Sequence, residues 1–292
     1  MKSSYITNSV LIVVIGLAIW FLQDRSKNEP EENQRFSHLT ADQVSSISIQ
    51  QPGKPIISLQ KEQLTWHIIS PFPALANQTR INILLRLLNA SVHGEFQPMS
   101  SSSLSQFGLT KPQAILTLND ETIVFGNVET ISQNRYILYK EMIYLINDDT
   151  TPLLRVSADN FVDNHLIPES SEITKLVLPT LDDKQAEVTI IQEDGEWHSS
   201  DVNLTTDLLK QLADNWQYAQ ASQVSHITDE EKIEMLHGLP VSIHFAENAQ
   251  VLHFVLNLDE HQLTLFNTNM NLLYRFPLAL KTQLLPSSIQ VP

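Results

Sequence analysis

The chain contains the same order of expected elements twice, and this internal repeat constrains its fold more than any other feature. In each copy, three short alternating segments precede a long helix, a short helix ending in Gly-Leu, a proline and four more alternating segments. Trp66 and Trp197 are 131 residues apart, and Gly108 and Gly238 are 130 apart. Because two unrelated landmarks agree within one residue, we infer a tandem duplication in which each copy builds its own sheet against its own helix.

Apolar residues that alternate with polar ones predict short strands separated by tight turns. The expected strands are 44–49, 56–59, 64–69, 114–118, 122–125, 135–139 and 142–146 in the first copy, and 173–178, 186–192, 196–199, 241–245, 251–256, 262–266 and 272–276 in the second. A helix of similar length is expected from Thr79 onward and over residues 204–216, because leucines recur there at helical spacing. Thr228 and Glu231 have the spacing of a capping box at the start of the second short helix.

These elements predict an α+β fold, in which an N-terminal transmembrane helix is followed by two tandem repeats of an antiparallel β-sheet with helices packed on one face. The expected segments are a transmembrane anchor over 1–23, a linker over 24–39, a first α+β repeat over 40–165 and a second α+β repeat over 166–292.

The first 23 residues contain an apolar run that predicts an uncleaved membrane anchor. From Tyr5 to Leu22 the run is 18 residues long, and as a helix it would reach roughly 27 Å, enough to cross a bilayer. Gly16 and Ala18 have the spacing of a signal-peptide cleavage site, so a cleaved signal is one alternative, and a buried core helix is another. We favour the anchor because apolar residues continue beyond Ala18.

The charges beside this run do not settle its orientation. Lys2 and the amino terminus precede it, whereas Arg25 and Lys27 follow it, which leaves the positive-inside rule nearly balanced. The chain contains no cysteine, so nothing in it depends on a reducing compartment, and large folded regions translocate largely regardless of charge. We therefore expect a single-pass protein of the bacterial inner membrane with its C-terminal domains in the periplasm.

The acidic composition argues against nucleic acid as a partner. The formal net charge is −15, and no basic stripe with interleaved aromatic residues is present. An acidic surface repels phosphate groups, so we expect no nucleic-acid binding.

Several phrases of the first half together resemble the family known as domain of unknown function 4340. They are LTWHI, followed by Pro71 and Ala76, the phrase LSQFGLTKPQAILTL, and a VFG turn before RYILY. The likeness covers residues 40–165 well and the second half loosely. It implies an anchored accessory module outside the cytoplasm, because members of the family are bacterial envelope proteins, and some are fused to or encoded with auxiliary subunits of gliding-type ABC transporters. It implies no active site, and any transporter link would run through a partner.

Potential catalytic and metal-binding patterns have simpler structural interpretations. His244, His253 and His261 lie close together in sequence, but their alternation does not place three ligands on one face, as zinc would need. Ser58 and Lys61 have the spacing of penicillin-recognising enzymes, but they fall on a strand instead of a helix. We therefore expect no catalytic residues, no metal site and no cofactor.

Acidic and aromatic clusters also have structural interpretations. The pairs Asp148-Asp149 and Asp182-Asp183 are expected to be solvated turn residues, with calcium binding the alternative. Aromatic side chains could form a recognition patch, but packing in the core or across strands is favoured; these residues are Phe125, Tyr136, Tyr139 and Tyr144.

The residues that we single out are structural: Trp66, Trp197, Gly108 and Gly238. Both indoles are expected to fill equivalent positions between sheet and helix, with the histidine that follows each one facing solvent.

The expected function is that of a non-enzymatic, membrane-anchored accessory or scaffold protein that binds envelope proteins, with ABC transporter subunits among the candidates. The alternative is a periplasmic module that holds a glycan or small molecule between the repeats, and an unrecognised hydrolase is the third possibility. A large apolar-walled cleft at the seam near residues 157–172 would favour the ligand-binding module, and a tightly packed seam would exclude it.

Overall fold

The computed structural model describes residues 35–98, 101–168, 170–180, 187–201, 203–246 and 251–286. The anchor expected over 1–23, most of the expected linker and the Asp182-Asp183 turn lie outside these residues. Within them, no helix has both the length and the apolar character needed to cross a membrane.

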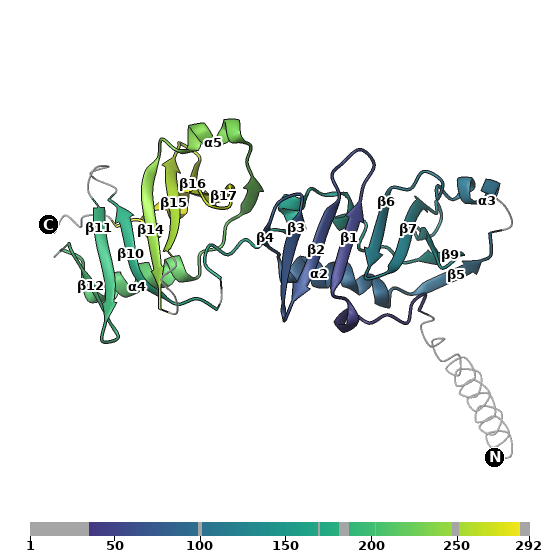
Figure 1. Cartoon of the computed structure of the whole chain (residues 1–292), viewed down its shortest axis with the longest axis horizontal. Helices are drawn as coiled ribbons and strands as arrows, with labels where there is room; N and C mark the ends of the chain where they lie inside the picture. The colour runs from purple at the N-terminus through teal and green to yellow at the C-terminus, as the bar shows by residue number, and fades with distance from the viewer. Residues whose placement is uncertain are drawn as a thin grey trace, which may run out of the picture.

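The described residues form two antiparallel β-sheets with a few short helices (Figure 1). The first sheet has nine strands in the order β4-β3-β2-β1-β6-β7-β8-β9-β5. Its elements are η1 (Ala41–Gln43), β1 (Ser46–Gln50), β2 (Ile57–Glu62), β3 (Thr65–Ser70), β4 (Ala74–Leu75), α2 (Gln78–Leu85), η2 (Arg86–Asn89), β5 (Val92–Phe96), α3 (Ser101–Gln106), β6 (Ala114–Leu118), β7 (Glu121–Val128), β8 (Arg135–Tyr139) and β9 (Met142–Ile146).

The second sheet has eight strands in the order β12-β11-β10-β14-β15-β16-β17-β13. Its strands and helices, with the connecting turns, are η3 (Leu153–Arg155), η4 (Ala158–Phe161), β10 (Ile173–Pro179), β11 (Glu187–Glu193), β12 (Glu196–Ser199), α4 (Thr206–Gln217), β13 (Gln223–His226), α5 (Asp229–Met235), β14 (Leu239–Phe245), β15 (Val251–Leu258), β16 (Gln262–Asn267), β17 (Leu272–Pro277), η5 (Leu278–Leu280) and α6 (Lys281–Leu284). Apart from β4, the two sheets place their strands in the same relative order.

Three strands were not expected from the sequence: β4, β5 and β13. All three lie at sheet edges; β4 has only two residues, and β5 and β13 have at most one buried position each. Period-two alternation is therefore weak in them. The two long helices also differ: α2 has eight residues and tightens into η2, whereas α4 has twelve.

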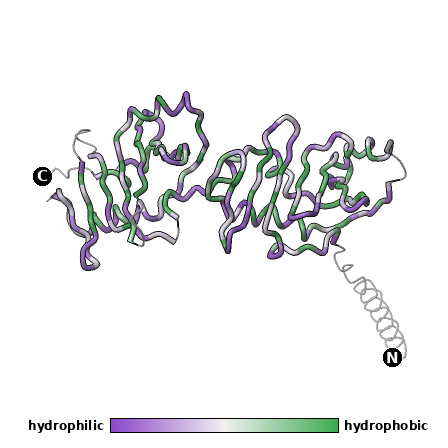
Figure 2. The backbone as a smooth tube through the Cα atoms, in the orientation of Figure 1, coloured by the Kyte–Doolittle hydropathy of each residue, from purple (hydrophilic) through white to green (hydrophobic). Residues whose placement is uncertain are grey.

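The hydrophobic core extends through both halves of the chain. Ile81, Leu84 and Leu85 of α2 are buried with the first sheet, and Leu209, Leu212 and Trp216 of α4 are buried with the second. Hydrophobic residues recur along the strands, whereas many hairpin turns are hydrophilic (Figure 2). On the face of the second sheet opposite the main core, Met235 of α5 packs on a small hydrophobic cluster around Phe266. The capping box expected at Thr228 and Glu231 is confirmed.

The connection between the halves forms backbone hydrogen bonds with both. Residues 161–166 pair with the β4 region on one side and with residues 219–221 on the other. The bonds run from Asn77 N to Phe161 O (2.7 Å), Asp163 N to Leu75 O (2.8 Å), Leu166 N to Ala219 O (2.9 Å) and Ala221 N to Asn164 O (2.8 Å). The two sheets therefore follow one another along the long axis without a free linker between them (Figure 1).

Side chains pack across the same seam. The ring of Phe72, which follows β3, stacks on the ring of His226 in β13 at 4.4 Å between centroids and 13° between planes. The backbone N–H of His226 also donates to Asp159 Oδ1 at 2.9 Å. Because main-chain pairing, ring stacking and a side-chain acceptor all act here, the seam resists bending.

Candidate functional site

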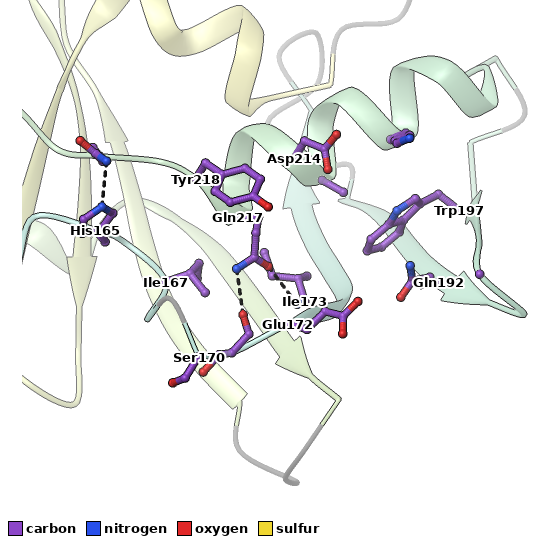
Figure 3. Close-up of a pocket in the computed structure, with 15 residues that line it drawn as sticks. His165, Ile167, Ser170, Glu172, Ile173, Gln192, Trp197, Asp214, Gln217 and Tyr218 are labelled. Carbon is purple, nitrogen blue, oxygen red and sulfur yellow. Dashed lines mark hydrogen bonds between the residues drawn. The ribbon is translucent and has the colours of Figure 1, made fainter. Parts of the chain in front are cut away.

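The main candidate site is a hollow of about 820 Å³ beside α4 in the second half of the chain. It extends from His165 at the seam to Trp197 near the free edge of the second sheet (Figure 3). Its walls come from three parts of the chain, which are residues 165–173, helix α4 and the ends of β11 and β12. The hollow is therefore a groove on one half and does not separate the two repeats.

Trp197 forms the far end of this groove and is half-buried. It lies opposite Gln192 of β11, and β12 is the outermost strand on that side. The equivalent Trp66 is only 1% exposed. In the first half, β4 pairs outside β3, and Ala76 N donates to Trp66 O at 2.9 Å. Trp197 also packs against the core, but it is less buried than Trp66, and the described residues of the second half include no counterpart of β4.

Helix α4 presents a polar stripe to the groove. Lys210, Asp214 and Gln217 are spaced by four and three residues, which puts them on one helical face. Gln217 holds the opposite wall, because its Oε1 accepts from Ile173 N at 3.1 Å and its Nε2 donates to Ser171 O at 2.8 Å. Trp216 points into the core instead, where its Nε1 donates to Leu284 O at 2.7 Å.

His165 fixes the seam end of the groove. Its Nδ1 lies 2.8 Å from Asp163 Oδ1, and its Nε2 lies 2.8 Å from Gln220 Nε2. These contacts fit a neutral ring whose Nδ1–H donates to Asp163 and whose Nε2 accepts from Gln220. A catalytic histidine oriented by a carboxylate would offer its second nitrogen to a nucleophile, whereas this nitrogen is bonded to an amide. We interpret His165 as a positioning residue.

A second hollow of about 390 Å³ lies on the first half of the chain, beside Trp66 and the start of α2. It shares His165 and Ser170 with the groove beside α4. The same short segment of the connection thus borders both hollows. At the seam between them, the connection forms backbone hydrogen bonds with both halves.

The three clustered histidines do not converge. His244 of β14 and His253 of β15 lie on one sheet face, where His253 Nδ1 is 3.1 Å from Ser242 Oγ. Burial lowers the pKa of His244, and the neighbouring charges of Lys175 and His253 lower it further. His261 lies beyond β15 in a turn, where its N–H donates to Asp259. The described residues include no group of three or more histidine, aspartate, glutamate or cysteine side chains that could hold a metal ion.

Asp148 does not behave as the solvated turn residue that we expected. It forms a buried ion pair with Arg135 Nε, and both side chains are less than a tenth exposed. Burial alone would raise the pKa of Asp148, but hydrogen bonds from Arg135 and Thr151 outweigh it and hold that pKa below its usual value. Arg135 Nη1 also donates to Gly126 O at 2.7 Å. The pair anchors the end of β9 to β8 and β7; Asp149 beside it is exposed.

The remaining residues singled out from the sequence lie in packed positions. Phe125 and Tyr139 are in the core, and Tyr136 packs on Phe107 at 4.4 Å. Ser58 lies on β2 opposite Ser48 and does not begin a helix. Gly108 has a φ of +71°, and a Cβ there would collide with Asn127. A Cβ on Gly238 would collide with Leu256 O and with Asn257, whose position is equivalent to that of Asn127.

Comparison with known proteins gives one match. The family model described as a domain of unknown function (DUF4340) matches residues 66–236, which is more than half of the chain. The match begins at Trp66 and ends just after α5, so it spans the seam and includes much of the second half, to which the resemblance seemed loose. No curated protein and no solved structure matches the chain.

Proposed function

Because the chain belongs to the DUF4340 family, we propose that it is a membrane-anchored accessory or scaffold protein of the bacterial envelope that acts by binding other envelope proteins. Subunits of an ABC transporter complex are the first candidate partners. Residues 1–23 are proposed to form a single span of the inner membrane, with both sheets in the periplasm.

The observation that carries this proposal is the closed seam. A scaffold must hold two surfaces at a fixed spacing, and here the connection pairs with both sheets instead of hanging free. Interfaces between domains of one chain usually permit relative motion unless they are extensive. The stacking of Phe72 on His226 adds to the backbone pairing and supports a rigid, elongated body.

The start of the described chain is also fixed to the first sheet, at the side farthest from the seam. Phe36 is buried and meets the Tyr139 ring edge-on at 5.3 Å. Ser37 Oγ donates to Glu121 at 3.2 Å and lies 3.1 Å from Tyr139 Oη. A span ending near residue 23 would therefore leave a tether of only about a dozen residues, which keeps the first sheet close to the membrane.

The proposal includes a tandem duplication as the origin of the two halves. The matching strand orders support it, and so do the paired glycine contacts. Gly108 lies against Asn127, Gly238 lies against Asn257, and each member of one pair is 130 residues from its counterpart. The extra strand β4 would then be a difference acquired by one copy.

Orientation can be tested with single cysteine reporters, because the chain has no cysteine of its own. Leu64→Cys is a suitable site, since this side chain is 85% exposed. We expect a membrane-impermeant maleimide to label it in cells whose outer membrane has been permeabilised. Leu84→Cys, at a buried position, is the matched control and should react only after denaturation. Labelling of Leu64→Cys only after lysis would contradict a periplasmic location.

Scaffolding itself is tested by cross-linking in living cells, followed by capture of the full chain in detergent. We expect defined envelope proteins to copurify in fixed proportion to the chain. Ser48→Arg with Ser58→Arg places two charges on the uncovered face of the first sheet, and Trp197→Ala alters only the groove. Loss of capture in one of these variants would show which of the two surfaces the partner binds. Recovery of the wild-type chain alone, with and without cross-linker, would overturn the proposal.

The ligand-binding alternative places a glycan or small molecule between the repeats. The hollow beside α4 on the second half offers such a ligand another place to bind.

A further inference from the structure

We propose that the groove beside α4 binds a linear, uncharged oligosaccharide, with Trp197 as the platform on which one sugar ring stacks. The groove is elongated and has a volume of about 820 Å³, which is within the range of ligand sites. It runs from His165 to Trp197 (Figure 3), so it suits an extended chain better than a compact molecule. This inference does not depend on the proposed scaffold role.

Two aromatic residues, Trp197 and Tyr218, border the groove. Trp197 is half-buried, and Tyr218 is 75% exposed. Within the described part of the chain, neither the indole N–H of Trp197 nor the hydroxyl of Tyr218 has a hydrogen-bond partner. An aromatic ring offers an apolar face together with a polar edge, which matches the C–H face and the hydroxyl rim of a sugar ring. The presence of two such rings along one groove therefore points to a sugar ligand.

Polar groups for the sugar hydroxyls lie along the same groove. Glu172, Gln192 and Asp214 line it, and none of these side chains bonds to another described residue. Carboxylates and amides can accept or donate several hydrogen bonds. Gln192 lies directly opposite Trp197 across β11 and β12. A sugar ring on the indole would therefore have an amide within its reach.

The charges and polarity of the groove disfavour other ligands. Glu172 and Asp214 face a single lysine, Lys210, so an anionic ligand would meet a net negative charge. A purely apolar ligand would cover these polar groups without satisfying them, which costs free energy. An uncharged molecule with many hydroxyl groups meets neither penalty.

The wall opposite α4 is held in place before any ligand binds. Gln217 bonds to both Ser171 and Ile173, and His165 is fixed by Asp163 and Gln220. Binding would then require little ordering of the backbone, which favours affinity. Gln217 and His165 are positioning residues, whereas Trp197 and Asp214 are proposed to touch the ligand.

The experiment uses the full chain in a detergent without a sugar headgroup. It is first screened on an array of neutral and acidic glycans and then titrated by calorimetry with chitohexaose, cellohexaose and maltohexaose. We expect saturable binding to at least one neutral hexasaccharide. Trp197→Ala should weaken it about tenfold or more, whereas Trp197→Phe should retain most of it because a ring remains. Asp214→Ala should also weaken it about tenfold or more, which corresponds to the loss of a hydrogen bond to a charged group.

The matched control is His198→Ala, which changes the neighbouring exposed residue of β12 on the other face of the strand. It should bind as the wild type does. Circular dichroism establishes that each variant is folded. Absence of saturable binding to every neutral glycan overturns the proposal, and so does binding that a folded Trp197→Ala variant retains unchanged. Exclusive binding of acidic glycans would also overturn it.

Discussion

Trp66 and Trp197 occupy the second position of equivalent strands, β3 and β12, and among the described residues a further edge strand lies beside Trp66 but not beside Trp197. Trp66 lies opposite Lys61, and Trp197 lies opposite Gln192. Trp66 is therefore fully buried in the core, whereas Trp197 packs against the core and keeps part of its ring open to the groove beside α4. This difference between the two halves separates a stabilising role from a binding role.

Truncation of the two tryptophans should reveal that difference in stability. Trp66→Ala should lower the free energy of unfolding by about 3–5 kcal/mol, because it removes a fully buried indole and leaves a cavity. Trp197→Ala should cost less than about 2 kcal/mol, because solvent already reaches the ring. Urea denaturation of both variants and of the wild type measures these values. Equal losses would mean that Trp197 is as much a core residue as Trp66.

The buried pair of Arg135 and Asp148 should make stability depend on pH. Asp148→Asn leaves the Arg135 charge without its partner and should cost about 3–5 kcal/mol at pH 7. The folded-state pKa of Asp148 lies below its usual 3.8. The stability that this carboxylate contributes is thus complete well above pH 3.8 and is lost as the pH falls through the lower folded-state pKa.

Denaturant titrations between pH 7 and pH 2 test this dependence. The gap between the wild type and Asp148→Asn should remain constant down to about pH 5 and then narrow in more acidic solution. Asp120→Asn is the control, since Asp120 is exposed in a hairpin turn, and it should change stability by less than about 0.5 kcal/mol. A gap that persists unchanged at pH 2 would exclude the charge of Asp148 as its cause.

Gly108 and Gly53 allow steric and conformational effects to be separated. Both have a positive φ, +71° and +70°, so Gly108→Ala and Gly53→Ala share a cost of about 1 kcal/mol for the left-handed backbone. Only at Gly108 does the added Cβ collide, against Asn127. We expect Gly108→Ala to lower the free energy of unfolding by about 2–4 kcal/mol, and Gly53→Ala to lower it only by the backbone cost of about 1 kcal/mol. Thermal denaturation of both variants measures these losses. Similar decreases in melting temperature would mean that the collision with Asn127 does not add to the cost.

Much of the sheet architecture could be predicted from alternation, and the candidate groove could not. The strands β6, β8, β9 and β12 have the bounds expected from sequence, and buried and half-buried positions alternate strictly in β6 and β8. β4, with two residues, carries no such signal, although it decides whether the tryptophan beside it is buried. The groove joins three segments far apart in the chain, and only tertiary structure brings them together.

Phe72 and His226 offer a test of whether the two halves unfold as one unit. Phe72→Ala removes a buried ring that stacks on His226 across the seam, which should weaken the coupling between the sheets. We expect the single calorimetric transition of the wild type to separate into two, because each half has its own sheet and helix. Phe96→Ala, at a 43% exposed position on β5 far from the seam, should leave one transition. If Phe72→Ala only shifts a single transition to lower temperature, the backbone pairing of residues 161–166 couples the halves without help from the rings.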